Sequence, residues 1–179
     1  MKHSPISRQG EIVGERITLR AFRDGDAALV ARFANDRRVA QMTTSIPFPL
    51  SLEAAEDYVK RAMADDRLED TWVIDGAKSG AAALLGVVSL KYLDREQSEI
   101  GLWVAPPFWN KGYASEAVNT LLTANPHGNK SVVASVFQDN PASARVMELT
   151  GFANLGEAEA FSLSRAAHVP TWTYLKRLA

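Results

Sequence analysis

The chain has 179 residues, of which 46% are hydrophobic, and its 20 Lys and Arg nearly balance its 21 Asp and Glu. These values fit one ordinary soluble domain and exclude a strongly basic nucleic-acid binder. Cysteine is absent and the three histidines are far apart in sequence, so we expect no disulfide, thiolate site or bound metal. The longest apolar run, residues 80–88, is too short to span a membrane. The first ten residues lack the apolar core of a secretory signal, and we expect a cytoplasmic location.

The first part of the chain predicts a strand followed by two helices. Residues 1–14 predict a flexible polar tail before a single domain over residues 15–179. Residues 17–22 alternate in polarity, as a strand does. Asp24 and Asp26 offer N-caps for a short helix, and Ser51 offers the cap of a second helix after a proline-rich loop.

The rest of the chain predicts the larger part of a sheet. Three strand-like segments separated by polar turns predict an antiparallel meander: residues 71–75, 83–92 and 98–104. They are followed by a helix, a strand, a second helix and two strands, at residues 112–125, 131–137, 140–150, 152–163 and 169–176. This order predicts an α+β fold with one mixed, mostly antiparallel sheet of about seven strands flanked by about four helices.

Three common ligand-binding motifs are missing. The sequence contains no phosphate loop with adjacent Gly and Lys, no GxGxxG after a predicted strand and no HExxH. Nucleotide hydrolases of the P-loop type, dinucleotide-binding folds and zinc enzymes of the HExxH type are therefore not expected.

One strand–helix junction has the features of an anion site. The predicted strand 98–104 ends at Pro106-Pro107, and Lys111-Gly112 leads directly into a helix. The first turn of a helix has backbone N–H groups without intrahelical partners, at the positive end of the helix dipole. Gly112 lets an anion approach the main chain closely. The junction predicts either a phosphate site or a plain tight turn.

A second junction lies at residues 140–151. Asn140 is suited to cap a helix, Pro141 to its first turn and Gly151 to its end. These residues alone indicate a well-capped helix. Asn140 and Ser143 also lie beside the carboxyl end of a predicted strand, where ligands gather in open α/β sheets.

In this order, the two segments resemble the GNAT superfamily of N-acetyltransferases. Residues 109–117, Trp-Asn-Lys-Gly-Tyr-Ala-Ser-Glu-Ala, resemble its pyrophosphate-binding motif, Gln/Arg-x-x-Gly-x-Gly/Ala. Asn-Pro-Ala-Ser at residues 140–143, followed by Gly151-Phe152, resembles the branch that acetylates the N-termini of ribosomal proteins. The resemblance extends over about residues 15–177. Trp109 departs from the Gln or Arg of the superfamily pattern, as is usual in this branch, and the segment from Ala117 to Ser131 is short for the branch.

The resemblance implies that the chain binds acetyl-CoA. The pyrophosphate would lie on the loop and first helical turn, at Asn110, Lys111, Gly112, Tyr113, Ala114 and Ser115. The pantetheine arm would run along Leu102, Trp103 and Val104, where the family's sheet opens towards strand 131–137, and Asn140 would hold a pantetheine carbonyl or the acceptor.

The implied reaction transfers an acetyl group to a primary amine without a metal. A base must take the proton of the amine, and we assign this role to Glu99, which shares a strand face with Gly101 and Trp103. Glu116 is the weaker candidate because it lies beside packed helical residues. Ser143 would donate a hydrogen bond to the departing sulfur.

The sequence leaves the acceptor open. It is either a peptide N-terminus, favoured by the resemblance, or a small amine, bound between residues 35–51 and 160–168. A non-catalytic acyl-CoA-binding module on the same fold is the alternative function. We expect a monomer or homodimer, with no nucleic-acid or membrane partner.

Overall fold

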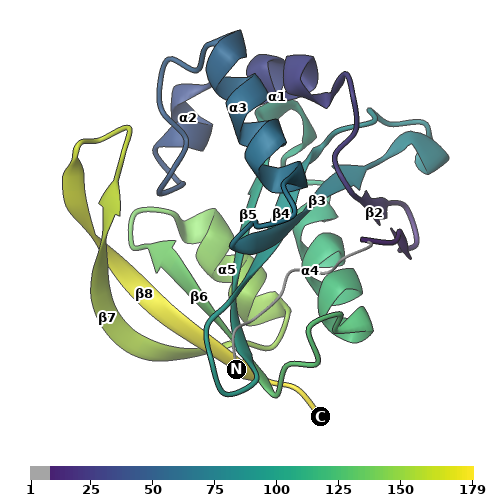
Figure 1. Cartoon of the computed structure of the whole chain (residues 1–179). Helices are drawn as coiled ribbons and strands as arrows, with labels where there is room; N and C mark the ends of the chain where they lie inside the picture. The colour runs from purple at the N-terminus through teal and green to yellow at the C-terminus, as the bar shows by residue number, and fades with distance from the viewer. Residues whose placement is uncertain (1–8) are drawn as a thin grey trace.

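The computed structural model describes residues 9–179. Within these residues, one sheet has the strand order β1-β2-β3-β4-β5-β6-β8-β7 (Figure 1). The strands are β1 (Ile12–Val13), β2 (Thr18–Arg20), β3 (Glu69–Asp75), β4 (Gly86–Tyr92), β5 (Gln97–Val104), β6 (Ser131–Phe137), β7 (Ala153–Ser162) and β8 (Ala167–Arg177). The helices are α1 (Asp26–Ala34), α2 (Arg37–Ala40), α3 (Leu52–Met63), α4 (Tyr113–Ala124) and α5 (Pro141–Leu149), with single 3-10 turns at Ala77–Ser79 and Pro106–Phe108.

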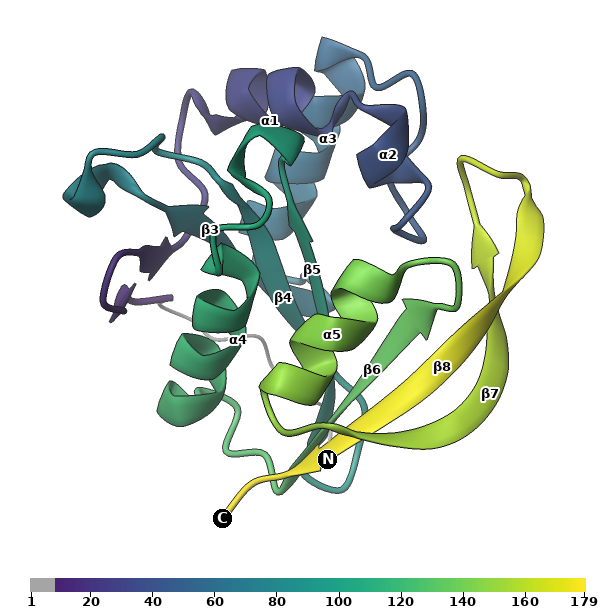
Figure 2. The same cartoon turned by 180° about the vertical axis from the view of Figure 1, so that it is seen from behind.

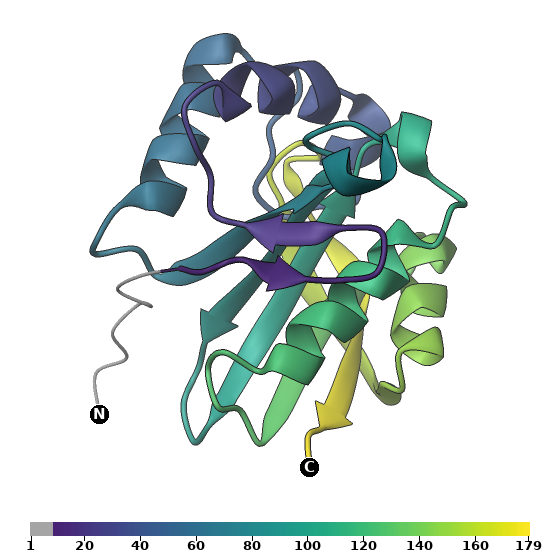
Figure 3. The same ribbon diagram turned by 90° about the vertical axis from the view of Figure 1, so that its right-hand side faces the viewer.

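The sheet separates two layers of helices. Helices α1, α2 and α3 cover one face, and α4 and α5 cover the other (Figures 1 and 2). Figure 3 looks past the β1–β2 hairpin and shows the two layers on either side of the strands. Alternation along the strands supplies both cores: on β3, Trp72 and Ile74 pack towards α4, whereas Val73 packs towards α1 and α3. The α+β architecture and the antiparallel β3–β4–β5 meander predicted from the sequence are confirmed.

Two elements were not predicted. The short helix α2 lies in a segment expected to be loop, and β1 pairs with β2 through Ile12↔Leu19 and Val13↔Thr18. Residues 1–8 of the expected tail lie outside the described residues. The sheet therefore begins before residue 15, because two residues of the presumed tail already belong to it.

The start of the first helix differs from the prediction. Its N-cap is Gly25, at φ 92°, and neither Asp24 nor Asp26 caps it. Asp26 is buried and accepts hydrogen bonds from the Arg20 guanidinium at 2.8 and 3.0 Å, while Arg20 Nε donates to Asp75 at 2.6 Å. A buried arginine needs such partners, so Asp26 joins α1 to β2 and β3. Ser51 caps α3 as predicted, accepting from the Ala54 N–H at 3.1 Å.

The sheet opens between β5 and β6. The two parallel strands pair only at their first residues, Gln97↔Ser131, Ser98↔Val132 and Glu99↔Val133. Beyond Glu99 they diverge, although β5 continues to Val104 and β6 to Phe137. We refer to this V-shaped gap, from Ile100 to Val104 on β5 and from Ala134 to Phe137 on β6, as the opening.

A buried polar chain holds the closed end of the opening. The Ser98 hydroxyl lies 2.9 Å from His127 Nδ1, and His127 Nε2 lies 2.7 Å from the Asp70 carboxylate. The same hydroxyl lies 2.9 Å from Asn129 Oδ1. These bonds tie β3 and β5 to the loop that leads into β6, and they fix the point where the two strands separate.

Candidate active site

The wide end of the opening contains the predicted anion site. Gly112 is the N-cap of α4, with φ 79° and no side-chain cap hydrogen bond, and Asn110 also has a positive φ of 60°. The first backbone N–H groups of α4, at Tyr113, Ala114 and Ser115, have no helical partner by geometry. The exposed Lys111 adds a positive charge at the same place. The junction therefore presents N–H groups, a glycine and a cation to an anion, as a phosphate site requires.

Arg16 makes contacts that stabilise this junction, a role that the sequence did not predict. Its guanidinium donates to the Lys111 carbonyl and to Glu116, both at 2.8 Å, and lies 4.6 Å from the centre of the Tyr113 ring. Glu116 also accepts the backbone N–H groups of Arg16 and Ile17. The Glu116 carboxylate therefore accepts structural hydrogen bonds, which agrees with its being the weaker candidate for the general base. Arg16 offsets the negative charge of Glu116 beside the predicted anion site.

The main chain of β5 supplies hydrogen-bonding groups along the opening. Leu93 N–H donates to the Gln97 carbonyl and Ala105 N–H donates to the Leu85 carbonyl, at 2.9 and 2.8 Å, at the two ends of the β4–β5 ladder. Bonded positions alternate in an antiparallel ladder. The backbone groups of Leu102 and Val104 therefore point into the opening.

Trp103 has a different environment from its two neighbours. Its backbone pairs with Val87 of β4, and its side chain is packed under α3 with only 8% exposed. Of the three residues expected to hold the pantetheine arm, only Leu102 and Val104 offer backbone groups to the opening. The Val104 carbonyl already accepts the Trp109 indole N–H at 2.6 Å, which holds Trp109 at the rim.

Asn140 and Ser143 lie at the other wall of the opening, where β6 leads into α5. Asn140 caps α5 by accepting from the Ser143 N–H at 3.2 Å, and its amide nitrogen donates to the Ser143 hydroxyl oxygen at 2.8 Å. The Ser143 hydroxyl is thereby left with its own proton to donate. The Asn140 side chain is used mainly to orient Ser143, and one amide N–H remains for a ligand.

Glu99 lies at the closed end of the opening, on the opposite face of the sheet from α5. It shares this face with Gly101, which is exposed, and with Trp103. Across the neighbouring strands, Glu99 is paired with Lys91 and Lys91 with Glu69. Beside the exposed Gly101, an incoming group can reach the opening.

Glu69 is a second carboxylate at this place that sequence reasoning missed. Surrounding protein atoms raise the pKa of Glu69 above its usual range, opposed by Lys91 and a hydrogen bond with Ser89, and Glu99 adds to the rise. Part of the Glu69 side chain remains exposed. Its nearness to Glu99 follows from strand register, which spacing within one strand does not reveal.

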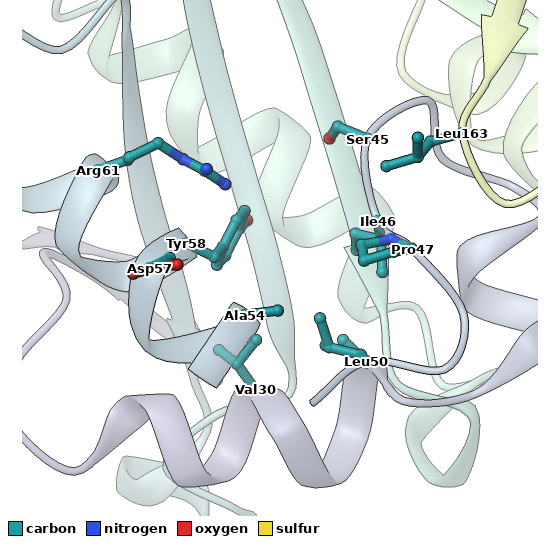
Figure 4. Close-up of a pocket in the computed structure, with 11 residues that line it drawn as sticks. Val30, Ser45, Ile46, Pro47, Leu50, Ala54, Asp57, Tyr58, Arg61 and Leu163 are labelled. Carbon is teal, nitrogen blue, oxygen red and sulfur yellow. The ribbon is translucent and has the colours of Figure 1, made fainter. Parts of the chain in front are cut away.

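A cavity of about 160 Å³ lies beyond this face, among α1, α3, the loop before α3 and the β7–β8 turn. Figure 4 shows Tyr58 and Arg61 of α3 on one side of it, and Ser45, Ile46 and Leu163 on the other. This position lies between the two segments that were predicted to form the acceptor cleft, residues 35–51 and 160–168.

The β7–β8 turn is fixed over the cavity by main-chain and charged contacts. Leu163 N–H donates to the Thr44 carbonyl at 3.1 Å. The Arg165 guanidinium donates to the Gln41 carbonyl at 2.6 Å and to Asp139 at 2.6 Å. This hydrogen bond to Arg165 holds the pKa of Asp139 below its usual range, so the contact stays charged at neutral pH.

Residues 9–179 contain neither a candidate metal site nor a helix suited to cross a membrane. Among residues 9–179, no group of three or more His, Cys, Asp or Glu side chains is placed to bind a metal ion. In the same part of the chain, no helix has the length and apolar character needed to cross a membrane.

Comparisons with known proteins identify the class. Residues 16–153 match the family model of the acetyltransferase (GNAT) domain. The uncharacterized N-acetyltransferase YoaA of Bacillus subtilis (strain 168) is 28% identical over 149 residues, which cover 79% of this chain and 82% of that protein.

Solved structures share the fold. RimL, a ribosomal L7/L12 alpha-N-protein acetyltransferase solved with coenzyme A, superposes with a TM-score of 0.79 at 18% identity, covering 94% of this chain and 98% of that one. Spermidine N-acetyltransferase from Vibrio cholerae, solved with CoA and spermine, superposes with a TM-score of 0.72 at 23% identity, covering 89% and 95%.

The fold and the matched domain define an N-acetyltransferase. Because the family model matches well over half of its length, this chain belongs to the GNAT acetyltransferase family. The resemblance to this superfamily seen in the sequence is thereby confirmed.

Proposed function

We propose that the protein transfers the acetyl group of acetyl-CoA to a primary amine. The observation that carries the proposal is the opening between β5 and β6, with the N-terminus of α4 at its wide end. The residues present fit the group: unpaired N–H groups, Gly112 and Lys111 suit a pyrophosphate, and the backbone groups of Leu102 together with the Val104 N–H suit the amides of a pantetheine arm. The solved relatives that hold CoA support this assignment.

Glu99 is proposed as the general base. When bound, acetyl-CoA supplies a thioester carbonyl that a neutral amine attacks, so that an N–C bond forms, the C–S bond breaks and the sulfur departs as a thiolate. The amine loses one proton, and the Glu99 carboxylate takes it directly or through a water molecule. Glu69 and Lys91 set the charge around Glu99 from the neighbouring strands.

Ser143 is proposed as the donor to the departing sulfur. Asn140 occupies one lone pair of the hydroxyl and directs its proton outward. A hydrogen bond to a developing negative charge stabilises the transition state more than the ground state. Ser143 and Glu99 lie on opposite faces of the opening, so the two roles do not compete for one place.

The fold does not choose the acceptor, because RimL and the spermidine enzyme share it. We infer a primary amine that reaches Gly101 from the cavity between α3 and the β7–β8 turn, at a peptide N-terminus or on a small molecule. The proposal includes a single acetyltransferase domain, predicted over residues 15–179 and extended here to include β1 at Ile12–Val13, in the cytoplasm, as a monomer or homodimer.

The direct test measures free thiol released from acetyl-CoA with a panel of peptide and small amines, together with mass spectrometry of the amine. We expect equal amounts of thiol and N-acetyl product with at least one amine. The non-catalytic alternative predicts that acetyl-CoA binds tightly while no amine raises thiol release above the rate of hydrolysis.

A further inference from the structure

Resting on the proposed acetyl transfer, we propose that the acceptor carries an apolar group of leucine or phenyl size and one anionic group beside it. The apolar group fills the cavity beneath α3, and Arg61 binds the anion. The class is therefore that of an apolar α-amino acid or a phosphate ester of the same shape, rather than a polyamine.

The size and lining of the cavity indicate the size of the apolar group on the acceptor. Val30, Ile46, Leu50 and Leu163 line it from three separate segments (Figure 4). Its volume of about 160 Å³ is close to the ~150 Å³ of an engineered apolar cavity that binds benzene. A leucine or phenyl side chain matches this volume, whereas an alanine methyl leaves most of it empty.

The charged residues at the mouth of the cavity indicate the charge of the acceptor. Arg61 lines it, is exposed, and makes no ion pair with any of residues 9–179. Asp57 lies one helical turn earlier and also lines the cavity. A mouth with one charge of each sign has no net charge with which to attract a polycation or a polyanion. A single carboxylate or phosphate satisfies Arg61, whose fork of donors suits either group.

Tyr58 connects the cavity to the reacting strand. It lines the cavity, and its hydroxyl approaches the indole of Trp103, two residues from Gly101 on β5. The Trp103 indole N–H is buried, and within the described residues it has no hydrogen-bond partner. The Tyr58 hydroxyl lies on the side of this donor, so an acceptor that contacts Tyr58 in the cavity is also close to β5. Burial raises the pKa of Tyr58 to about 12, so its hydroxyl stays neutral.

The experiment compares amines that differ in charge and in the size of the apolar group. At saturating acetyl-CoA, kcat/KM is measured for leucine, neutral leucinol, leucinol phosphate, glycine and spermidine, and for a peptide that begins with leucine. We expect leucine or leucinol phosphate to exceed leucinol and glycine at least tenfold, and the better of the two identifies the anion. The peptide and spermidine should lie below both.

Two variants and a control assign the effect to the cavity. Arg61→Gln should bring the anionic amines within about threefold of leucinol, mainly through KM, while Lys60→Gln on the same helix keeps the full preference. Ala54→Leu should remove the preference for leucine over glycine. The wild-type series alone overturns the inference if glycine or spermidine equals the better of the two anionic amines, or if leucinol equals both of them. If none of these amines is acetylated but another amine of the wider panel is, this inference alone fails. If no amine of either panel is acetylated by a protein that binds acetyl-CoA, the proposed function fails as well.

Discussion

Glu99 occupies the last paired position of β5, one residue before the strands part. A carboxylate there is close to the backbone of the opening and on the face from which we propose that the amine approaches. In the proposed reaction, this position gives access from the cavity side and a place beside the thioester. Glu69, two strands away, shares the face without bordering the opening.

Glu99→Gln keeps the shape of the side chain and removes its basicity. We expect turnover to fall about a hundredfold, within the range for loss of a general base. The loss should be largest at low pH, where the amine is mostly protonated, and CoA affinity should stay unchanged. The measurement is the pH profile of kcat/KM.

Glu69→Gln is the matched control for this prediction, and it should lower turnover by less than about tenfold, since the carboxylate acts through charge only. A Glu99→Gln enzyme with near-normal turnover at every pH would show that Glu99 is a surface carboxylate. If Glu69→Gln alone were inactive, the base would be Glu69.

Ser143→Ala removes the donor to the departing sulfur while leaving the backbone cap at Asn140. We expect kcat to fall about tenfold, because a neutral hydrogen bond to a developing charge is worth about 1.5 kcal/mol. The pH profile should keep its wild-type shape, since the base is untouched. A kcat equal to that of the wild type, or an altered pH profile, would remove Ser143 from the sulfur side of the reaction.

At the scale of elements, the two strand–helix junctions were predictable because their signals are local. Gly112 and Asn140 each determine a helix start within a few residues of sequence, and both helices begin there. The Arg16–Glu116 contact joins residues 100 positions apart, and the nearness of Glu69 to Glu99 depends on register across two strand pairs. Neither relation leaves a pattern in a single sequence.

The opening itself was expected only through the resemblance to the family. No periodicity distinguishes a strand that pairs throughout from one that diverges after three residues, since the side chains alternate in both. Trp103 illustrates the same limit. Its place on the strand was predicted, but not that its backbone hydrogen-bonds to β4 instead of facing the opening. Asp26 is predicted as a cap although it pairs with Arg20, six residues earlier, because the burial of this arginine depends on Asp75, 55 residues further along the chain.

The start of α4 supplies a prediction about cofactor binding. Gly112→Val places a β-branched side chain at φ 79°, where the left-handed backbone costs L-residues about 1–2 kcal/mol, and beside the expected phosphates. We expect CoA affinity to fall at least tenfold by calorimetry, with the fold retained by circular dichroism.

Gly80→Val is the matched control, because Gly80 has the same φ of 79° with nothing within 4 Å of an added Cβ atom. It should carry a similar strain and bind CoA normally. Equal affinity in both folded variants would move the phosphate site away from α4.

At the scale of the whole molecule, the site depends on contacts between distant segments. Residues of α3, the loop before it and the β7–β8 turn surround the cavity, and Arg165 ties the turn to Gln41 and Asp139. The turn thus positions Leu163 over a cavity whose other walls come from the N-terminal third of the chain.

Arg165→Met keeps an unbranched apolar side chain, shorter by the end of the guanidinium group, and removes these hydrogen bonds. We expect KM for the amine to rise about tenfold, because the turn must be ordered when the acceptor binds, while CoA affinity stays as in the wild type. Steady-state kinetics with each substrate varied in turn checks this. An unchanged KM for the amine would show that the turn does not shape the acceptor site.

The central claim is that acetyl-CoA lies in the opening and bonds the free main chain of β5. Amide hydrogen exchange by NMR, with and without saturating CoA, tests it residue by residue. We predict that exchange at Leu102 and Val104 slows at least about tenfold when CoA binds, while Gly101 and Trp103, already bonded to β4, change little. Unchanged exchange at both Leu102 and Val104 in the CoA complex would contradict the account.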